Sequence, residues 1–473
     1  MNKIWLTLWT LVACQSINTA FAIDLTPIDG SEFGYEEAKH LASRAGFGGT
    51  PEEIEILLQL GPEKAVSRFF EESKNGLKFE HSGIFDEGLD PFPPSRPATT
   101  NLAKREGQAL GINVKSEGNR RLQPIVNKFF YWLRASRLET DRVAYWWANR
   151  MLSSPYALQE KMALFWHGHF ATNEDKVRDY RKMLNQIQLF REKGLGSFRT
   201  LLKDTAQDPA MLVFLDAGVN TADSPNENFA REIMELFTMG VGNYSEKDVR
   251  EAARAFTGWT VRGTNYYRDE TNHDAGAKEF LSFSGNYDGT DIIEIILSQE
   301  QTSEFVAAKI YRYFVNDSIS KEGIKKLGNL LSSEDYHIDK FLRTLFLSKD
   351  FYENAGSHIK SPIELMISTY KLMGATAVPG VPDFNEVSQA LGQRLLHPPT
   401  VAGWSEGKSW ITPSLLFERA NFVLDVVFPD LNFVPPDRFP VFTPEVARVQ
   451  QRLRQGQSVS QATKPSGISG AMN

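Results

Sequence analysis

Two histidines separated by one residue could do chemistry. They are His167 and His169, in the segment LQEKMALFWHGHFAT. On a continuous helix their side chains point to opposite sides, with His169 on the apolar face. If the chain instead extends at Gly168, both imidazoles project to one side, as a two-histidine metal site on a strand requires. The spacing leaves these alternatives open, together with a third in which His169 packs in the core and His167 ends a helix.

A polar face is predicted on a helix that begins near Ser224. Ser224, Pro225 and Glu227 fit a capping box with proline in the first turn. The polar face carries Glu227, Asn228, Arg231, Glu232 and Glu235. Carboxylates gathered in this way could ligate a hard cation or act as acid and base in a cleft. The alternative is a solvated face with weak ion pairs.

A second helix is predicted to begin at Ser245, where Asp248 completes a capping box. The preceding segment GVG is a short connection, so the two helices should form a helical hairpin. Arg250 and Arg254 lie on the polar side of this second helix. They could meet the carboxylates of the first helix or bind an anionic ligand.

Three further segments attract attention. His273 and Asp274 lie together in a polar loop, where functional groups are common. Trp404 and Trp410 could stack on flat ligands such as sugar rings if they are exposed, or fill the core beneath a loop. The segment KSPIE, which ends at Glu364, has the pattern of a capped helix start, so Glu364 is assigned to architecture.

The elements that must position these groups are mainly helical. Helical spacing of apolar residues predicts a mainly α fold, a large multi-helix globular domain with long loops. The expected segments are helices within 35–72, 121–260 and 291–374, a Pro-rich loop or insertion near 73–120, and polar loops with at most a small β-hairpin in 262–290. The family-type domain is expected over 23–430, and 431–473 is expected to be a disordered tail.

The first 22 residues are typical of a signal peptide. Lys3 is followed by an apolar stretch at 4–13 and by the sequence Ala-Phe-Ala at 20–22, which predicts a mature start at Ile23. The protein is therefore expected to be exported, to the periplasm or the medium. Alternatively, the segment LVAC resembles a lipobox, and a lipid on Cys14 would then anchor the chain to a membrane.

Bulk composition excludes few classes of protein. The 473 residues are 41% hydrophobic, enough for a sizeable core, and carry a formal net charge of −7. This gives no basic surface for nucleic acid, so no nucleic-acid partner is expected. Beyond the signal segment no stretch is long and apolar enough for a transmembrane helix.

Several motifs together resemble one protein family, the domain of unknown function 1800 family. They are HLASRAGFGGTPEEI from His40, EKMALFWHGHF from Glu160, DPAMLVFLD from Asp208, NENFAREIMELFTMGVGNYSEKDVREAARAFTGW from Asn226, HDAG from His273, KSPIE from Lys360 and HPPTVAGW from His397. The similarity spans roughly residues 36–425. It implies an exported bacterial protein of mostly helical build, and it assigns no reaction and no residue roles.

The leading hypothesis is a hydrolase acting on an envelope or extracellular substrate, with a divalent metal ion as the cofactor that could assist it. Its predicted catalytic residues are His167, His169, Glu227, Arg231, Glu235, His273 and Asp274, and the predicted metal ligands are His167, His169 and His273. All of this requires the three segments to share one polar cleft. The alternative is a non-catalytic envelope protein that binds a polymer or a partner through Trp404 and Trp410.

Overall fold

The structure is a computed structural model that describes residues 23–70, 79, 123–380 and 382–428. Within the helix that begins at residue 123, side chains are described from Ser136 onward. The predicted signal segment with Cys14, most of the Pro-rich loop and the predicted tail lie outside the described residues. Expectations about those parts therefore stay predictions.

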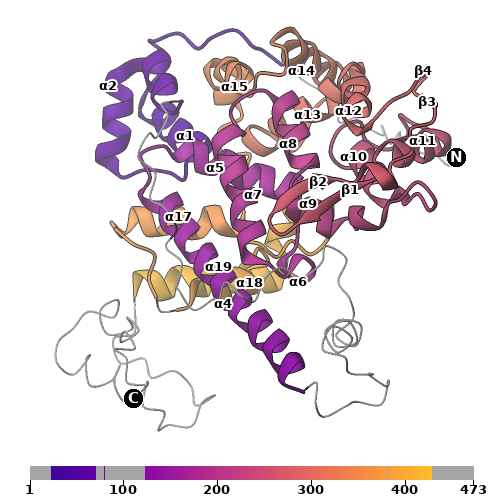
Figure 1. Ribbon diagram of the computed structural model, residues 1–473. Coiled ribbons are helices and arrows are strands. Elements are labelled where there is room, and N and C mark those ends of the chain that lie inside the picture. The colour runs from indigo at the N-terminus through magenta and orange to yellow at the C-terminus, as the bar shows by residue number, and fades with distance from the viewer. Residues whose placement is uncertain (1–22, 71–78, 80–122, 381, 429–473) are drawn as a thin grey trace, which may run out of the picture.

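Helices make up most of the described chain, as predicted (Figure 1). The α-helices are α1 (Tyr35–Ala45), α2 (Pro51–Arg68), α4 (Gln123–Ser153), α5 (Ala157–His169), α6 (Glu174–Val177), α7 (Tyr180–Lys193), α8 (Phe198–Ala206), α9 (Pro209–Phe214), α10 (Glu227–Glu235), α11 (Glu246–Ala255), α12 (Gly289–Leu297), α13 (Glu300–Phe314), α14 (Lys321–Ser333), α15 (Ile338–Leu347), α16 (Lys349–Glu353), α17 (Pro362–Leu372), α18 (Phe384–Ala390) and α19 (Pro413–Val427). Short 3-10 helices are η2 (Ala217–Val219), η3 (Glu270–Asn272) and η4 (Gly407–Ile411).

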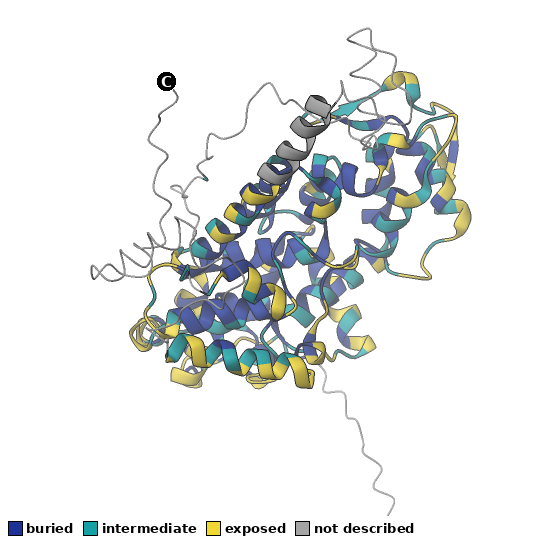
Figure 2. Ribbon diagram, turned by 90° about the horizontal axis from the view of Figure 1, so that it is seen from below, coloured by how far each residue is buried: buried dark blue, intermediate teal, exposed yellow. Residues whose placement is uncertain are grey.

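Helix α5 forms the centre of the fold. It contacts α1, α4 and α7, and nearly all its side chains are buried, including the charged Glu160 and Lys161. A helix that is buried all round belongs to the interior of a large domain. Figure 2 shows the same arrangement, with buried residues on the inner helices and exposed residues on the outer faces. The two histidines at the end of α5 are therefore core residues.

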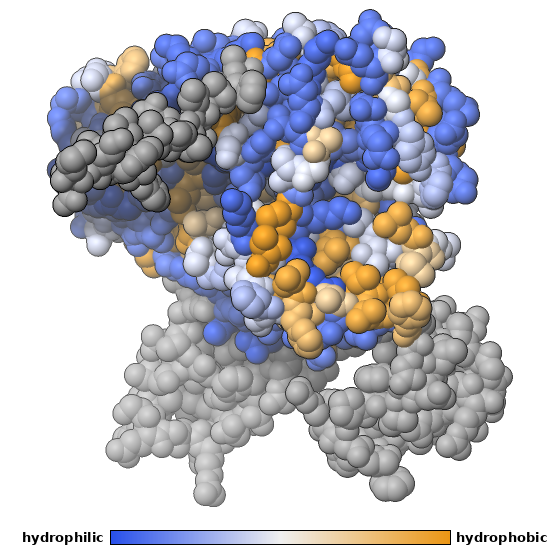
Figure 3. Space-filling model, turned by 180° about the vertical axis from the view of Figure 1, so that it is seen from behind, coloured by the Kyte–Doolittle hydropathy of each residue, from blue (hydrophilic) through white to orange (hydrophobic). Residues whose placement is uncertain are grey.

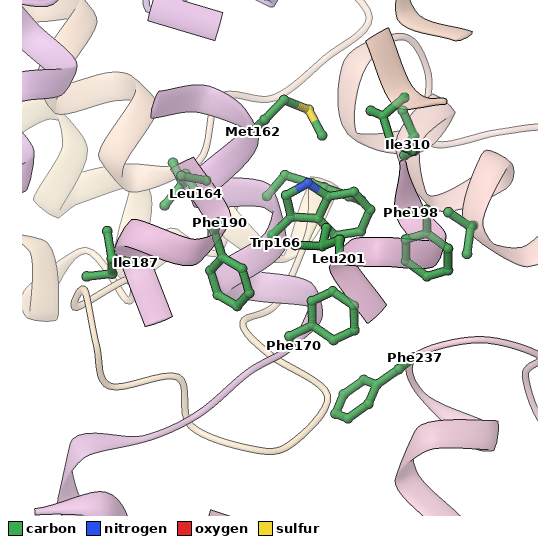
Figure 4. Close-up of a cluster of buried hydrophobic side chains, with 14 of the residues drawn as sticks. Met162, Leu164, Trp166, Phe170, Ile187, Phe190, Phe198, Leu201, Phe237 and Ile310 are labelled. Atoms are coloured by element: carbon green, nitrogen blue, oxygen red, sulfur yellow. The ribbon is translucent and has the colours of Figure 1, made fainter. Parts of the chain in front are cut away.

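An aromatic cluster packs against the end of α5 (Figure 4). The Trp166 ring stacks on Phe170 and on Phe198, in both cases at 5.6 Å between centroids, and Phe170 stacks on Phe190 at 5.9 Å. The indole Nε1 donates to the Gly194 carbonyl at 2.8 Å. A Cβ atom on Gly194 would lie 2.7 Å from the indole ring, so only glycine permits this approach.

Helix starts follow the capping patterns at most predicted positions. Ser245 with Asp248 caps α11, and Ser361 with Glu364 caps α17. The predicted start of α10 at Ser224 is wrong by two residues. Ser224 forms a tight bridge with Thr221, and the side chain of Asn226 accepts from the Asn228 amide instead. Asparagine caps helices as well as serine does, so the helix begins after Asn226.

Two small antiparallel hairpins fill the polar region between α11 and α12. Strands β1 (Trp259–Arg262) and β2 (Asn265–Arg268) pair with Trp259 opposite Arg268. Strands β3 (Lys278–Phe280) and β4 (Phe283–Gly285) form the second pair. The sequence predicted at most one hairpin here, and the second was missed because its strands are only three residues long.

One face of the molecule gathers apolar side chains toward its lower edge (Figure 3). Helix α19 and the end of α17 lie in that part of the molecule and expose several large apolar residues, namely Leu372, Met373, Leu416, Phe417, Leu424 and Phe428. No helix among the described residues is both long and apolar enough to cross a lipid bilayer.

Candidate functional site

A hollow opens beside the C-terminal half of α5. Its walls come from α5, the end of α13, the segment that leads into α17, and the segment that leads into η4. The lining residues are Leu164, Phe165, Gly168, His169, Lys309, Arg312, Tyr313, Asp317, His358, Ile359, Ser361, Glu364, Gln393, Trp404, Ser405, Glu406, Gly407 and Trp410. The empty space is about 680 Å³ when the open mouth is included, and part of it is open to solvent.

A group of ionisable side chains, here called the buried charge cluster, meets at one wall of this hollow. It consists of Arg44, Lys161, His358 and Glu364. The Glu364 carboxylate accepts hydrogen bonds from the Lys161 ammonium and from the Ser361 amide, the latter at 2.7 Å. Arg44 Nη1 lies 3.5 Å from the same carboxylate. Arg44, Lys161 and Glu364 are almost completely buried.

Backbone carbonyls complete the partners of the two cations. Lys161 Nζ donates to Gly46 at 2.9 Å, and Arg44 Nε donates to Phe314 at 2.9 Å. Burial lowers the pKa of Lys161 to about 8, although the attraction of Glu364 opposes the shift. Burial alone would raise the pKa of Glu364, but Lys161 and His358 outweigh it, and this pKa lies well below its usual range. Glu364 is therefore ionised.

His358 connects the buried charge cluster to the hollow. Its Nε2 lies 3.2 Å from a Glu364 oxygen, and an ionised carboxylate can only accept, so the proton is on Nε2. Burial lowers the pKa of His358, and Glu364 offsets this only in part. The imidazole is thus neutral at neutral pH, and its Nδ1 lone pair has no hydrogen-bond partner among the described residues.

Two other residues of the hollow share this feature. The His169 Nδ1 and the Tyr313 hydroxyl are buried and likewise have no partner among the described residues. Buried polar atoms are normally paired, so each orphan needs an explanation such as a bound water or a ligand. Three such atoms around one hollow make it a candidate site for a polar molecule.

Two cations of the hollow could contact an anionic group. Lys309 and Arg312 line the hollow, and neither has a hydrogen bond or an ion pair to any side chain in the described part of the chain. Burial lowers the pKa of Lys309, and the attraction of Glu406 opposes this shift. The charged side chains that line the hollow are the cations Lys309 and Arg312 and the carboxylates Asp317, Glu364 and Glu406. Glu364 is already paired with Lys161 and Arg44, which lie behind the wall, so an anionic group would contact Lys309 and Arg312.

The two predicted tryptophans line the hollow and are not exposed. Trp404 is only 9% exposed and Trp410 only 4% exposed. The idea that they form an exposed contact surface is therefore wrong. They pack under the loop, as the alternative interpretation expected, and supply flat apolar walls for the hollow.

Of the predicted catalytic residues, only His169 lines the hollow. Helix α5 runs through His169, so the extended arrangement at Gly168 is wrong. His169 Nε2 donates to the Phe237 carbonyl at 3.0 Å. Burial lowers its pKa well below the usual range, which keeps the ring neutral.

His167 has a structural position instead. Its Nε2 accepts from the Leu396 amide at 3.1 Å, so this nitrogen is not available to a metal. Its ring packs against Trp147 and Trp404, and burial lowers its pKa to about 3. Leu396 has a φ of 65°, a strained value for leucine, which the hydrogen bonds of its amide and carbonyl hold in place.

The predicted acidic helix face lies on the surface and makes ion pairs. Arg231 contacts Glu227 at 3.0 Å, as the spacing predicted, and Glu246 of α11 at 2.7 Å. Glu235 instead accepts from the Tyr244 hydroxyl at 2.8 Å. These contacts agree with the alternative interpretation, a solvated helix face with ion pairs.

The His273 loop is tied to α11. The His273 Nδ1 donates to the Thr257 carbonyl at 3.0 Å, and Asp274 pairs with Arg254 at 2.7 Å. Arg254 therefore meets this loop and its neighbour Glu251, not the carboxylates of α10. The structure does not bring the three segments into one cleft, and catalytic roles for these residues stay predictions.

The predicted metal ligands do not form a group of converging atoms. Among the described residues, the group with metal-ligand geometry is Glu174, Asp175 and His397, whose ligand atoms all lie within 4.8 Å of one another. Burial raises the pKa of Glu174 to about 7, and the neighbouring Asp175 adds to this. His167, His169 and His273 are not part of this group, and each makes a hydrogen bond to a different backbone group.

The chain is thus a mainly α protein with a polar hollow beside its central helix. It belongs to the family described as protein of unknown function, DUF1800, whose family model matches residues 40–468. The predicted family membership is confirmed over nearly the whole chain. No curated protein and no solved structure matches it.

Proposed function

We propose that the protein is a hydrolase that uses His358 as a general base and acts on a substrate with a negatively charged group. The observation that carries this proposal is the His358–Glu364 pair at the wall of the hollow. A neutral imidazole whose Nε2–H is held by a carboxylate presents Nδ1 as a proton acceptor, an arrangement that enzymes use to activate water.

The reaction follows from these contacts. His358 Nδ1 removes a proton from a water molecule as the water attacks the electrophilic centre of the substrate. The resulting imidazolium is stabilised by Glu364, which Lys161 and Arg44 keep ionised and fixed in place. Every proton is then accounted for, because the imidazolium can return its proton to the leaving group.

Substrate binding falls to the remaining residues of the hollow. Lys309 and Arg312 make no hydrogen bond or ion pair to a side chain among the described residues, although Lys309 Nζ lies 5.3 Å from the centroid of the Phe305 ring, and both cations can hold an anionic group. Trp404 and Trp410 offer flat walls to an apolar part of the substrate. The orphaned hydroxyl of Tyr313 and Nδ1 of His169 can hydrogen-bond to its polar atoms.

Nitrophenyl esters and phosphoesters test the proposal, each used with and without a free carboxylate. The variant H358Q keeps a donor for Glu364 but removes the base, so we expect its rate to fall about 10²–10⁴-fold. H337Q is the matched control, because the His337 side chain is partly exposed and lies outside the hollow. The double variant K309M/R312Q should raise KM for the charged substrates only. Absence of hydrolysis, or a wild-type rate in H358Q, would contradict the proposal.

We further propose that the protein works after export, which is supported by the signal pattern of residues 1–22. The expected first mature residue, Ile23, is buried, and its carbonyl accepts from Lys326 Nζ at 2.8 Å, so the folded domain would begin at the cleavage point. Mass spectrometry of the mature N-terminus tests this. A start at Ile23 or an acylated Cys14 supports export, and an intact residue 1 contradicts it.

A further inference from the structure

Three ligand atoms converge outside the hollow, where helix α6 meets the segment before Trp404. Glu174 and Asp175 open α6, and His397 comes from the other segment. Their ligand atoms lie within 4.8 Å of one another. The two segments are far apart in the sequence and are joined by a backbone hydrogen bond of 2.9 Å from the Glu174 amide to the Leu396 carbonyl.

Glu174 is the most unusual member of this group. Glu174 is only 1% exposed, and neither of its carboxylate oxygens has a hydrogen-bond partner among the described residues. Burying a carboxylate without a partner is strongly unfavourable. Most acidic residues that the structure describes lie on the surface or pair with a cation, so the Glu174 position needs an additional partner.

The basic side chains near this group contact atoms other than the Glu174 carboxylate, although Arg137 and Arg178 lie close enough to attract it. Arg137 lies 3.4 Å from Asp175, and Arg394 lies 2.8 Å from Asp141. Arg178, at the end of α6, donates to the Asp175 carbonyl. Asp141 lies close enough to act on both Glu174 and His397 and adds negative charge. None of these basic groups hydrogen-bonds to Glu174.

We propose that Glu174, Asp175 and His397 bind a divalent transition-metal ion of the zinc type. Two carboxylates and one imidazole are a ligand set that suits zinc, and three protein ligands leave a coordination position for water. The side chain of Asp175 is 62% exposed, so the ion can enter from solvent. The buried carboxylate of Glu174 then gains the cation that it lacks.

The ion would also fix one wall of the hollow. His397 follows Leu396, whose amide donates to His167, and the His167 ring packs against Trp404 at 5.2 Å. Asn173 adds a hydrogen bond of 2.9 Å to the Pro398 carbonyl. A metal that joins α6 to His397 would therefore stiffen the segment that ends in Trp404.

Zinc titration of the purified, EDTA-treated protein tests the site, by calorimetry and by the thermal unfolding midpoint. We expect one zinc ion per chain and a rise of the midpoint on binding. E174Q and H397A should each weaken zinc binding at least tenfold. E174Q should unfold without metal at the wild-type temperature or above it, because it removes an unpartnered buried charge.

H337A is the matched control, since His337 Nδ1 lies 3.6 Å from Asp339, the distance that also separates His397 from Asp175. Its zinc affinity should equal that of the wild type. If E174Q or H397A fails to fold, the zinc affinity of D175N tests the proposal instead, because the exposed side chain of Asp175 can change without disturbing packing. Absence of zinc binding by the wild type, or equal affinity in these variants, overturns the proposal.

Discussion

Two regions of the molecule contain the same kinds of charged residue in opposite surroundings. On the α10–α11 hairpin, Arg231 joins Glu227 and Glu246 at the surface, where water screens the charges. In the buried charge cluster, Lys161 and Glu364 meet with almost no exposure to solvent. A surface pair adds little stability, whereas an interior pair cannot lose a partner without a large penalty. Residue type alone therefore did not identify the candidate site, and enclosure distinguishes it from the surface hairpin.

The largest effect is expected from breaking the buried charge cluster. E364Q leaves Lys161 and Arg44 buried without a counter-charge, so we expect a loss of about 3–5 kcal/mol in the free energy of unfolding. E246Q, on the hairpin, removes a carboxylate from an exposed pair and should change stability only slightly. Urea unfolding of the three proteins measures both. Equal losses of unfolding free energy in E364Q and E246Q would contradict the predicted difference between the buried charge cluster and the surface hairpin.

The pH dependence of stability sharpens the same comparison. The pKa of Lys161 falls from 10.5 to about 8 in the fold, so between these values the unfolded chain binds more protons than the folded chain. Raising the pH from 8 to 10.5 should therefore stabilise the wild type relative to K161M, by up to about 3 kcal/mol.

The exposed pair of Lys247 and Glu279 provides the control for this experiment. In that pair the pKa of Lys247 is raised, chiefly by its hydrogen bond to Glu279. Raising the pH should therefore not increase the free energy of unfolding of the wild type relative to K247M. Urea unfolding at several pH values distinguishes the two cases. If the difference in the free energy of unfolding between the wild type and K161M stays constant from pH 8 to 10.5, the pKa of Lys161 is not lowered and the prediction is contradicted.

The smallest effect is expected on the hairpin itself. R231A removes both surface ion pairs, and we expect it to lower the free energy of unfolding by less than about 1 kcal/mol. The loss should shrink further as salt is added, because mobile ions screen exposed charges. A larger loss in the free energy of unfolding that does not change with salt concentration would mean that the hairpin charges are as enclosed as those of the buried charge cluster.

The sequence predicted the helices better than the site. Ser245 and Ser361 each precede an acidic residue by three positions, a local pattern that fixes a helix start whatever the rest of the fold does. The predicted start of α10 was wrong because two capping residues, Ser224 and Asn226, lie close together, and Ser224 instead pairs with Thr221 in a turn.

The site depends on contacts between residues that are hundreds of positions apart. Glu364 was assigned to capping alone, yet its carboxylate both caps α17 and meets Lys161 of α5. His358 carried no pattern at all. A usable signal was Lys161 itself, since a lysine within the apolar run of a buried helix must find a counter-charge inside the protein. The sequence could not say which carboxylate that would be.

The ionisation of His358 is the most direct test of the account. Nitrogen NMR of the labelled protein, with H358Q to assign the signal, reports both the protonation state and the tautomer of this ring. We predict a neutral imidazole with its proton on Nε2 at pH 6.5, because burial lowers its pKa and Glu364 accepts from Nε2. An imidazolium at that pH, or a neutral ring with its proton on Nδ1, would contradict the proposed general base.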